Sequence, residues 1–348
     1  MTVITRDTHR TYEDVVSLDQ HNVITAKQKY LDATAQSGMC PLGLNTNILE
    51  QSMHLLKDIP TLQYKNFDYE LIRKADEILL EDSHFTHTYW TLGASLACEA
   101  AVKIGFRTTG KKGLIGMPHG NNGATFAGNS INYATDRNLF YGDVSAIRNY
   151  YYKSLLESIE RFHSKCFGVV IEPLLYQEGL VSPGDLNEIH QACKKHNLLL
   201  ILDETFTGYY RTGSKWYHQK YNLQPDMIFT GKGINNGAVS VGCVLLTQKV
   251  FDQLQEVTKG RFEFWQTASG SPGPCATTLI ALPQLKNLSG KHLFSCETIE
   301  GLTEEDALAQ GFIVKIKNNK MVCSPPFTWT KEEYAKLSTL TTRVIFYA

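Results

Sequence analysis

Two apolar runs, residues 166–175 and 198–205, flank a helical segment, and this unit constrains the fold more than any other part of the chain. The first run, CFGVVIEPLL, is typical of a strand that is covered on both faces. Ser182 and Pro183 supply an N-cap and a first-turn proline for the segment between the runs, where apolar residues recur at helical spacing. Because such crossovers are right-handed and join parallel strands, the unit predicts an α/β fold.

Two features near the predicted strands are typical of a ligand site. Asp203 ends the second apolar run, and ligands of open α/β sheets bind outside the carboxyl ends of strands. A predicted helix over 95–110 follows the small residues Gly93 and Ala94. Its free backbone N–H groups and positive dipole end favour a phosphate, and Gly93 lets the backbone come close.

Composition indicates which classes of partner to expect. Lys and Arg number 34 against 35 Asp and Glu, so no net field attracts nucleic acid or an acidic membrane. The N-terminus has no signal-peptide apolar region, and no run approaches the roughly 18 apolar residues of a membrane span. We therefore expect a cytoplasmic protein with small-molecule partners. The eight cysteines include no Cys-x-x-Cys pair, which predicts buried free thiols and no metal site.

The pattern predicts three parts of the chain. Residues 1–60 form an N-terminal segment that lies against a large α/β domain over 61–275. Residues 276–348 form a small α+β C-terminal domain. Within it, 311–322 predicts a hairpin with two asparagines at the turn, and a closing helix follows Pro325 and Pro326.

Three segments, in order along the chain, resemble one known family. They are DETFTGYYRTG (203–213), PDMIFTGKGINNGAVSVG (225–242) and TASGSPGPCATT (267–278). An Asp at a strand end, a later Lys in a small-residue loop and then Thr-x-x-Gly-x-Pro are together similar to the class III aminotransferases, which are fold-type-I pyridoxal 5'-phosphate (PLP) enzymes. The resemblance extends from about Tyr30 to PPFTWTKEEY near the C-terminus. It implies a mostly parallel central sheet covered by helices, a small α+β C-terminal domain and PLP as the cofactor.

The resemblance implies the two principal roles in the site. Lys232 would carry PLP as a Schiff base, and its amine must be neutral to attack an aldehyde, a state that burial favours by lowering the pKa. Asp203 would pair with the pyridine nitrogen. A carboxylate in this position keeps the ring protonated, and the protonated ring withdraws electrons from the reacting carbon.

Further cofactor contacts are implied by matched positions. Ala94 and Ser95 match the residues that hold the phosphate, and Glu172 matches an acid near the cofactor. Thr267 matches a threonine that reaches the phosphate of the other subunit, which implies a homodimer. Arg211 matches an Arg-Thr-Gly turn, and we expect it to be structural.

Several cofactor-binding positions depart from the family pattern. In the family's tyrosine-histidine-glycine motif, Pro118 replaces the tyrosine and would cover the ring face, whereas the histidine is kept as His119. Thr205 and Phe206 replace an aliphatic residue and a glutamine after the Asp-Glu pair. The contacts to the ring face and to its 3-oxygen are therefore expected to differ from those of the family.

The positions that recognise a substrate carboxylate also differ. Many family members place an arginine three positions before Pro-Pro and a switching glutamate after Glu-Pro, where this chain has Val322 and Gln177. An apolar valine does not offset the desolvation of a carboxylate. We expect an amine or carbonyl substrate that lacks a carboxylate at that point. The segment between Leu285 and Gly311 is also shorter than in the family, so the pocket would be more open or would be completed by the partner subunit or another protein.

Three functions remain open on this reading. The first is an aminotransferase that moves an amino group between an amine or amino acid and an aldehyde or ketone. The second is an aminomutase or racemase of the glutamate semialdehyde aminomutase type, which the Thr-x-Ser-Gly-x-Pro form at 267–272 also resembles. The third is a degenerate scaffold subunit, against which the intact Lys232 and Asp203 argue.

Overall fold

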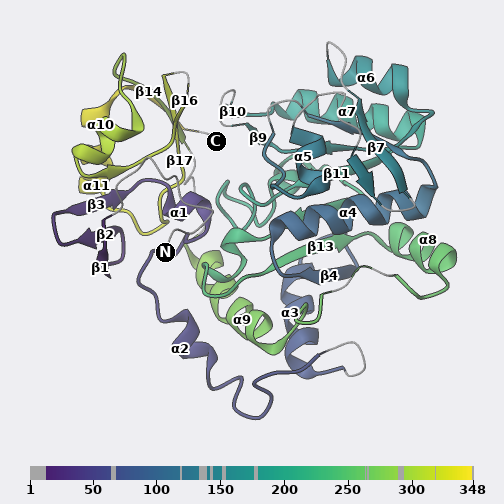
Figure 1. The fold of residues 1–348 in the computed structure, drawn as a ribbon, viewed down its shortest axis with the longest axis horizontal. Coiled ribbons are helices and arrows are strands. Elements are labelled where there is room, and N and C mark those ends of the chain that lie inside the picture. The colour runs from purple at the N-terminus through teal and green to yellow at the C-terminus, as the bar shows by residue number, and fades with distance from the viewer. Residues whose placement is uncertain are drawn as a thin grey trace.

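A computed structural model describes residues 13–63, 68–117, 120–132, 139–141, 144–150, 154–175, 179–262, 264, 266–288, 294–317 and 319–346. Within these residues, an eight-stranded sheet forms the centre of the larger part of the molecule (Figure 1). In spatial order its strands are β4 (His87–Thr91), β13 (Gly242–Leu246), β12 (Met227–Thr230), β11 (Leu199–Asp203), β8 (Cys166–Ile171), β5 (Gly113–Gly116), β7 (Val144–Tyr150) and β6 (Leu139–Tyr141).

The predicted crossover unit is confirmed. Strands β8 and β11 are parallel neighbours, with Leu202 paired to Ile171. Between them, α7 (Pro183–His196) begins at Ser182, whose side chain accepts a hydrogen bond from the backbone N–H of Asp185. Strands β12, β11, β8, β5 and β7 pair in parallel, whereas β13 and β6 pair antiparallel to their neighbours. The sheet is therefore mostly parallel, as fold type I requires.

Helices cover both faces of this sheet because its strands are apolar on both sides. Leu199 and Ile201 of β11 point into one core cluster, and Leu200 and Leu202 point into the other. The first cluster includes α4 (Ala94–Thr109), α5 (Phe126–Asn132) and α8 (Gln248–Thr258). The second includes α3 (Glu70–Leu80), α6 (Leu155–Phe162), α7 and α9 (Pro272–Asn287). The result is a three-layer α/β/α arrangement.

A smaller α+β unit is built from the C-terminal part of the chain. Its antiparallel sheet has the order β16 (Ile316–Lys317), β17 (Lys320–Cys323), β14 (Phe294–Thr298) and β18 (Thr341–Phe346), and it carries α10 (Glu304–Ala309) and α11 (Lys331–Leu337). The predicted hairpin is confirmed between β16 and β17, where Lys317 pairs with Lys320. The closing helix is confirmed as α11, but β18 follows it and was not predicted.

The N-terminal strands join this C-terminal unit. Strands β1 (Val15–Leu18), β2 (Asn22–Thr25) and β3 (Lys29–Asp32) form a meander, and β3 pairs in parallel with β15 (Phe312–Ile313). Figure 1 accordingly shows the purple N-terminal strands beside the yellow C-terminal elements. Because this pairing connects the two ends of the chain, the domain boundaries at 60 and 276 stay a prediction.

The chain between β3 and the large unit contains two short elements, α1 (Ala35–Gly38) and α2 (Ile48–Ser52). Backbone φ angles at α1 are positive, and Asp32 stabilises this left-handed turn through both carboxylate oxygens. Helix α2 lies against α9 on a segment that projects from the body in Figure 1. No helix of the described residues is long and apolar enough to cross a membrane. All eight cysteines are free and buried, as predicted.

Candidate active site

Two acids lie at neighbouring strand ends. Asp203 is the last residue of β11, and Glu172 directly follows β8. Because Leu202 pairs with Ile171 in parallel register, the next residue on each strand, Asp203 and Glu172, is brought to the same edge of the sheet. Both side chains are buried, with 3% of Asp203 and 6% of Glu172 exposed. A buried acid pair at the carboxyl edge is the first component of the site.

Asp203 is held by two hydrogen-bond donors. The backbone N–H of Thr205 donates to Oδ1 over 3.0 Å, and the side-chain amide of Asn122 donates to Oδ2 over 2.8 Å. Burial raises the pKa of Asp203, whereas these donors and the positive charge of Lys232 act in the opposite direction. The carboxylate is therefore oriented before any ligand enters.

Glu172 is in a less favourable position for a negative charge. Its Oε2 accepts one hydrogen bond, from the backbone N–H of Asn121 over 2.6 Å. Burial and the negative charge of Asp203 raise the pKa of Glu172 to about 8. Asp203 accepts more hydrogen bonds than Glu172, so its ionised form is the better stabilised of the two acids.

Lys232 lies beyond the next strand of the sheet. It follows β12 after Gly231 and begins the 3₁₀ turn η3 (Lys232–Asn235). Its Nζ lies 4.7 Å from the ring centroid of Phe206, and the side chain remains partly accessible. Burial lowers the pKa of Lys232 and Arg211 adds to this effect, while Asp203 and Glu172 oppose it. A lysine with a lowered pKa beside an aromatic wall can present the neutral amine that Schiff-base chemistry needs.

Phe206 lies beside Lys232, and Thr205 lies beside Asp203. The Phe206 ring is buried against the left-handed turn α1, since a Cβ atom added at Gly38 would lie 3.1 Å from its Cε2. Thr205 contributes its backbone N–H to Asp203, as described above. Thr205 and Phe206 are therefore brought to Lys232 and Asp203, and their contacts with a cofactor stay a prediction.

The lysine loop packs directly on the start of α4. A Cβ atom added at Gly231 would lie 2.9 Å from Ala94 Cβ and 3.1 Å from Ala94 N. A Cβ atom added at Gly242 would lie 2.4 Å from the backbone carbon of Gly93. Only glycine leaves room for this approach, so the close packing brings Lys232 and the N-terminus of α4 to one place.

The N-terminus of α4 has the features of an anion site. Gly93, Ala94 and Ser95 are partly exposed, and nothing lies within 4 Å of a Cβ atom built at Gly93. Helix α4 has 16 residues, so its dipole and unpaired N–H groups give this end a positive potential. The predicted phosphate position therefore has open space and donor groups, beside a lysine and a buried acid. This donor set fits PLP.

Other predicted residues are placed differently. Thr267 is exposed at the start of a turn, and it contacts neither Lys232 nor Asp203 in any hydrogen bond of the described residues. The neighbouring Gln266 accepts a hydrogen bond from the backbone N–H of Leu92 over 3.3 Å, which connects this turn to the strand that feeds α4. Pro118, His119 and Gln177 lie outside the described residues.

Sequence reasoning missed Asn122 and Glu204. Asn122 follows Pro118 and His119, where this chain differs from the family's tyrosine-histidine-glycine motif, and no sequence pattern pointed to it. Glu204 is fully buried and accepts four hydrogen bonds, from Thr207, from the backbone of Tyr217, and from the backbone and ring of His218. The acid pair Asp203-Glu204 was visible in the sequence, but only the fold shows that Glu204 points away into the core.

Arg211 is consistent with the predicted structural role. Its Nη1 donates to the carbonyl of Pro325 over 3.0 Å, and its guanidinium carbon lies 5.1 Å from the centroid of the Phe327 ring. These contacts attach the loop after Asp203 to the C-terminal unit. Val322 is buried in β17 of that unit.

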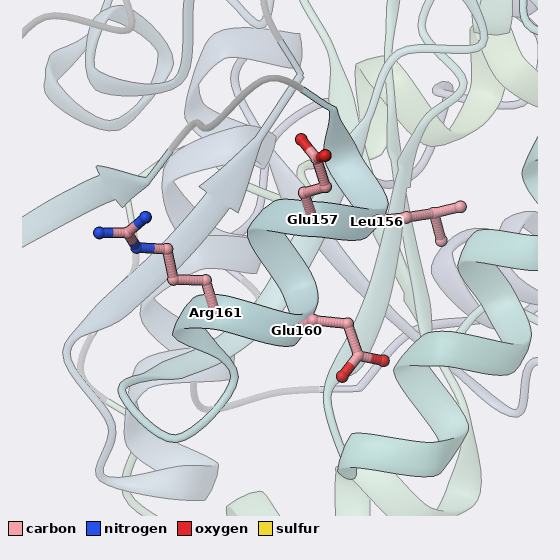
Figure 2. Close-up of a pocket in the computed structure, with 4 residues that line it drawn as sticks. All are labelled: Leu156, Glu157, Glu160 and Arg161. Atoms are coloured by element: carbon pink, nitrogen blue, oxygen red, sulfur yellow. The ribbon is translucent and has the colours of Figure 1, made fainter.

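A separate hollow lies on α6 and is lined by Leu156, Glu157, Glu160 and Arg161 (Figure 2). Figure 2 shows these side chains leaving the helix in different directions rather than converging. Glu160 is also paired with Lys195 and His196. The hollow has none of the residues found at the strand ends, so we place the candidate site at Lys232 and Asp203.

Comparisons with known proteins find one family to which this chain is similar. The profile of the class-III aminotransferases matches residues 20–300. The acetylornithine aminotransferase of Archaeoglobus fulgidus is 29% identical over 302 residues, which cover 84% of this chain and 74% of that protein. An omega-aminotransferase of Caulobacter vibrioides is 27% identical over 227 residues, which cover 56% of this chain and 52% of that protein.

The fold is also similar to solved structures. The pyridoxamine phosphate (PMP)-bound aminotransferase of Vibrio fluvialis has a TM-score of 0.84 at 18% identity, and the alignment covers 97% of this chain and 95% of that one. At this identity the likeness concerns the fold alone, whereas the profile match spans most of the chain. The chain therefore belongs to the class-III aminotransferase family, whose members are PLP-dependent transaminases.

Proposed function

We propose that this PLP-dependent transaminase binds its cofactor covalently through Lys232 and uses Asp203 as the partner of the pyridine nitrogen. The observation that carries the proposal is the convergence of Lys232, buried Asp203 and the open N-terminus of α4. PLP supplies an electron-withdrawing ring that stabilises negative charge at the substrate carbon. Lys232, Asp203 and the N-terminus of α4 then each have a role that their environment supports.

Lys232 holds the cofactor and moves a proton. Its lowered pKa favours the neutral amine, which can attack an aldehyde and later accept a proton from the substrate. Asp203, with donors on both oxygens, accepts a hydrogen bond from the protonated ring nitrogen. Backbone N–H groups at Ala94 and Ser95 bind the phosphate. Phe206 keeps water from one side of the amine.

For the substrate, we propose an amine or amino acid whose carboxylate, where it has one, is not bound at the usual arginine position. Val322 is 3% exposed and offers no donor there. Relatives named omega-aminotransferase and omega-amino acid–pyruvate aminotransferase support such a substrate. The named relatives favour transamination over the aminomutase or racemase alternative.

A homodimer in the cytoplasm is the proposed assembly and location. Thr267 is exposed in the single chain, as expected for a residue that completes a partner's site. Leu49, Met53 and Ile59, on the projecting segment around α2, are also exposed and would be covered by a second copy. Eight buried free thiols agree with a reducing compartment.

The test is the visible absorbance of the purified protein with PLP. We expect a covalent-cofactor band that disappears when Lys232 is changed to Ala and that changes on addition of an amine donor as the cofactor is aminated. A panel of amines with and without an α-carboxylate then defines the donor. A band that persists in Lys232→Ala, or no PLP binding by the natural chain, would overturn the assignment.

A further inference from the structure

We propose that Asn122 is a positioning residue, which orients Asp203 toward the pyridine nitrogen by donating a hydrogen bond to one carboxylate oxygen. This inference rests on the proposed function of Asp203. Asn122 is 3% exposed, and its Nδ2 lies 2.8 Å from Asp203 Oδ2. The two residues are far apart in sequence, and the contact joins the loop after β5 to the end of β11.

The backbone around Asn122 is itself fixed. The backbone N–H of Asn122 donates to Oδ1 of Asn132 over 2.7 Å, and Nδ2 of Asn132 donates to the carbonyl of Gly123 over 2.9 Å. Asn132, at the end of α5, therefore fixes the backbone of the loop at both Asn122 and Gly123. The Asn122 side chain thus occupies a defined position rather than one of several.

Gly123 connects the same loop to the phosphate position. Its φ is +96°, and a Cβ atom added there would lie 2.3 Å from Ser95 Oγ. Asn121, the residue before Asn122, donates its backbone N–H to Glu172. Asn121, Asn122 and Gly123 therefore contact Glu172, Asp203 and the start of α4, respectively. A loop with these three contacts sets the spacing between the two ends of the cofactor site.

An amide is suited to this position for an electrostatic reason. The charged or titratable groups that influence Asp203 or respond to it are Lys232 after β12, Glu172 after β8 and the Cys98 thiol of α4. A neutral donor stabilises the Asp203 carboxylate without competing with Lys232 for it and without titrating. A second cation would neutralise the acid, and an ionised carboxylate would repel it.

The variant Asn122→Asp tests the role because it keeps the shape of the side chain and replaces the donor nitrogen with oxygen. At alkaline pH two carboxylates would face each other, so we expect the PLP dissociation constant to rise about tenfold to hundredfold. At acidic pH the introduced carboxyl is protonated and donates to Asp203, so the loss should shrink. Asn129→Asp is the matched control, since Asn129 is exposed on α5 and should leave PLP affinity unchanged.

The measurements are PLP titration of the apoprotein across pH, the absorbance band of the bound cofactor, and the melting temperature of the apoprotein. If Asn122→Asp binds PLP at alkaline pH as tightly as the natural chain does, the inference is overturned. An equal loss at every pH, with a lowered melting temperature, would also overturn it because it indicates a purely structural role. If the natural chain binds no PLP, the proposed function itself fails; if it binds PLP and Asn122 has no effect, only this inference fails.

Discussion

At the scale of single residues, the site is defined by how three titratable side chains share one environment. Burial favours the neutral form of each of Lys232, Asp203 and Glu172, and the charge of Lys232 favours the ionised form of both acids. Asp203 accepts hydrogen bonds from two donors, whereas Glu172 accepts a hydrogen bond from one. This difference stabilises the ionised form of Asp203 more than that of Glu172.

The variant Glu172→Gln should change how stability depends on pH. Because the pKa of Glu172 is raised from 4.5 to about 8, the folded protein binds this proton more tightly than the unfolded chain. The stabilisation is complete below pH 4.5 and is lost as pH rises toward 8 and beyond, a loss that glutamine cannot show. The melting temperature of the apo variant should therefore rise relative to the natural apoprotein as pH increases.

The exposed residue Glu256 provides the control for this experiment, because Glu256→Gln removes the same charge on the outer surface of α8. We expect no comparable pH-dependent difference in that variant. If the difference in melting temperature between Glu172→Gln and the natural apoprotein stays constant from acidic to alkaline pH, the raised pKa of Glu172 is wrong.

At the scale of elements, the important contact is between the lysine loop and the start of α4. Helix α4 supplies donors for an anion, η3 supplies Lys232, and glycines let the two backbones touch. Neither element contains the site by itself. The distance between phosphate position and lysine is thus set by backbone packing, which does not depend on flexible side chains.

Gly231→Ala should disturb this contact. The new Cβ would lie 2.9 Å from Ala94 Cβ and 3.0 Å from the carbonyl oxygen of Val241, so one of the two backbones must move. We expect weaker PLP binding and a smaller covalent absorbance band, with a loss of about 1–3 kcal/mol in stability. Gly184→Ala, at an exposed position where the nearest atom is 3.8 Å away, should change neither PLP binding nor the absorbance band. Equal PLP affinity in both variants would contradict the role of the Gly231 contact.

At the scale of the whole molecule, the two ends of the chain are joined. Beyond the pairing of β3 with β15, His21 Nδ1 lies 2.5 Å from Glu333 Oε1, and its Nε2 lies 2.8 Å from Thr328 Oγ1. Arg211 then connects the resulting unit to the loop that follows Asp203. The terminal unit is therefore attached to the loop that follows Asp203, while Thr267 and the segment around α2 are exposed.

The proposed homodimer can be tested by mixing variants. We expect the protein to sediment at twice the chain mass and Thr267→Ala to weaken PLP binding. If Thr267 serves the partner's site, a mixed dimer of Lys232→Ala and Thr267→Ala chains regains one site with both residues intact. Mixing should then restore tight covalent PLP binding at up to half of the sites in those dimers, as measured by titration of the visible band. No recovery in confirmed mixed dimers would show that Thr267 does not act across subunits.

Much of the fold could be predicted because its signals are local. The apolar runs of β8 and β11, the Ser182 cap of α7 and the small residues before α4 each act within a few positions along the chain. β18 and the pairing of β3 with β15 could not be predicted, because a short strand is stabilised by partners that are distant in sequence.

The sequence alone determined the identity of the chemical groups: a lysine, an acid at a strand end and a helix that starts after small residues, in an order that resembles one family. Only the tertiary structure decided their environment. It buried Asp203 beside Glu172, brought Asn122 within hydrogen-bond distance, turned Glu204 into the core and packed Gly231 against Ala94. The physical reason is that pKa values and hydrogen bonds depend on neighbours in space, and distant loops supply those neighbours here.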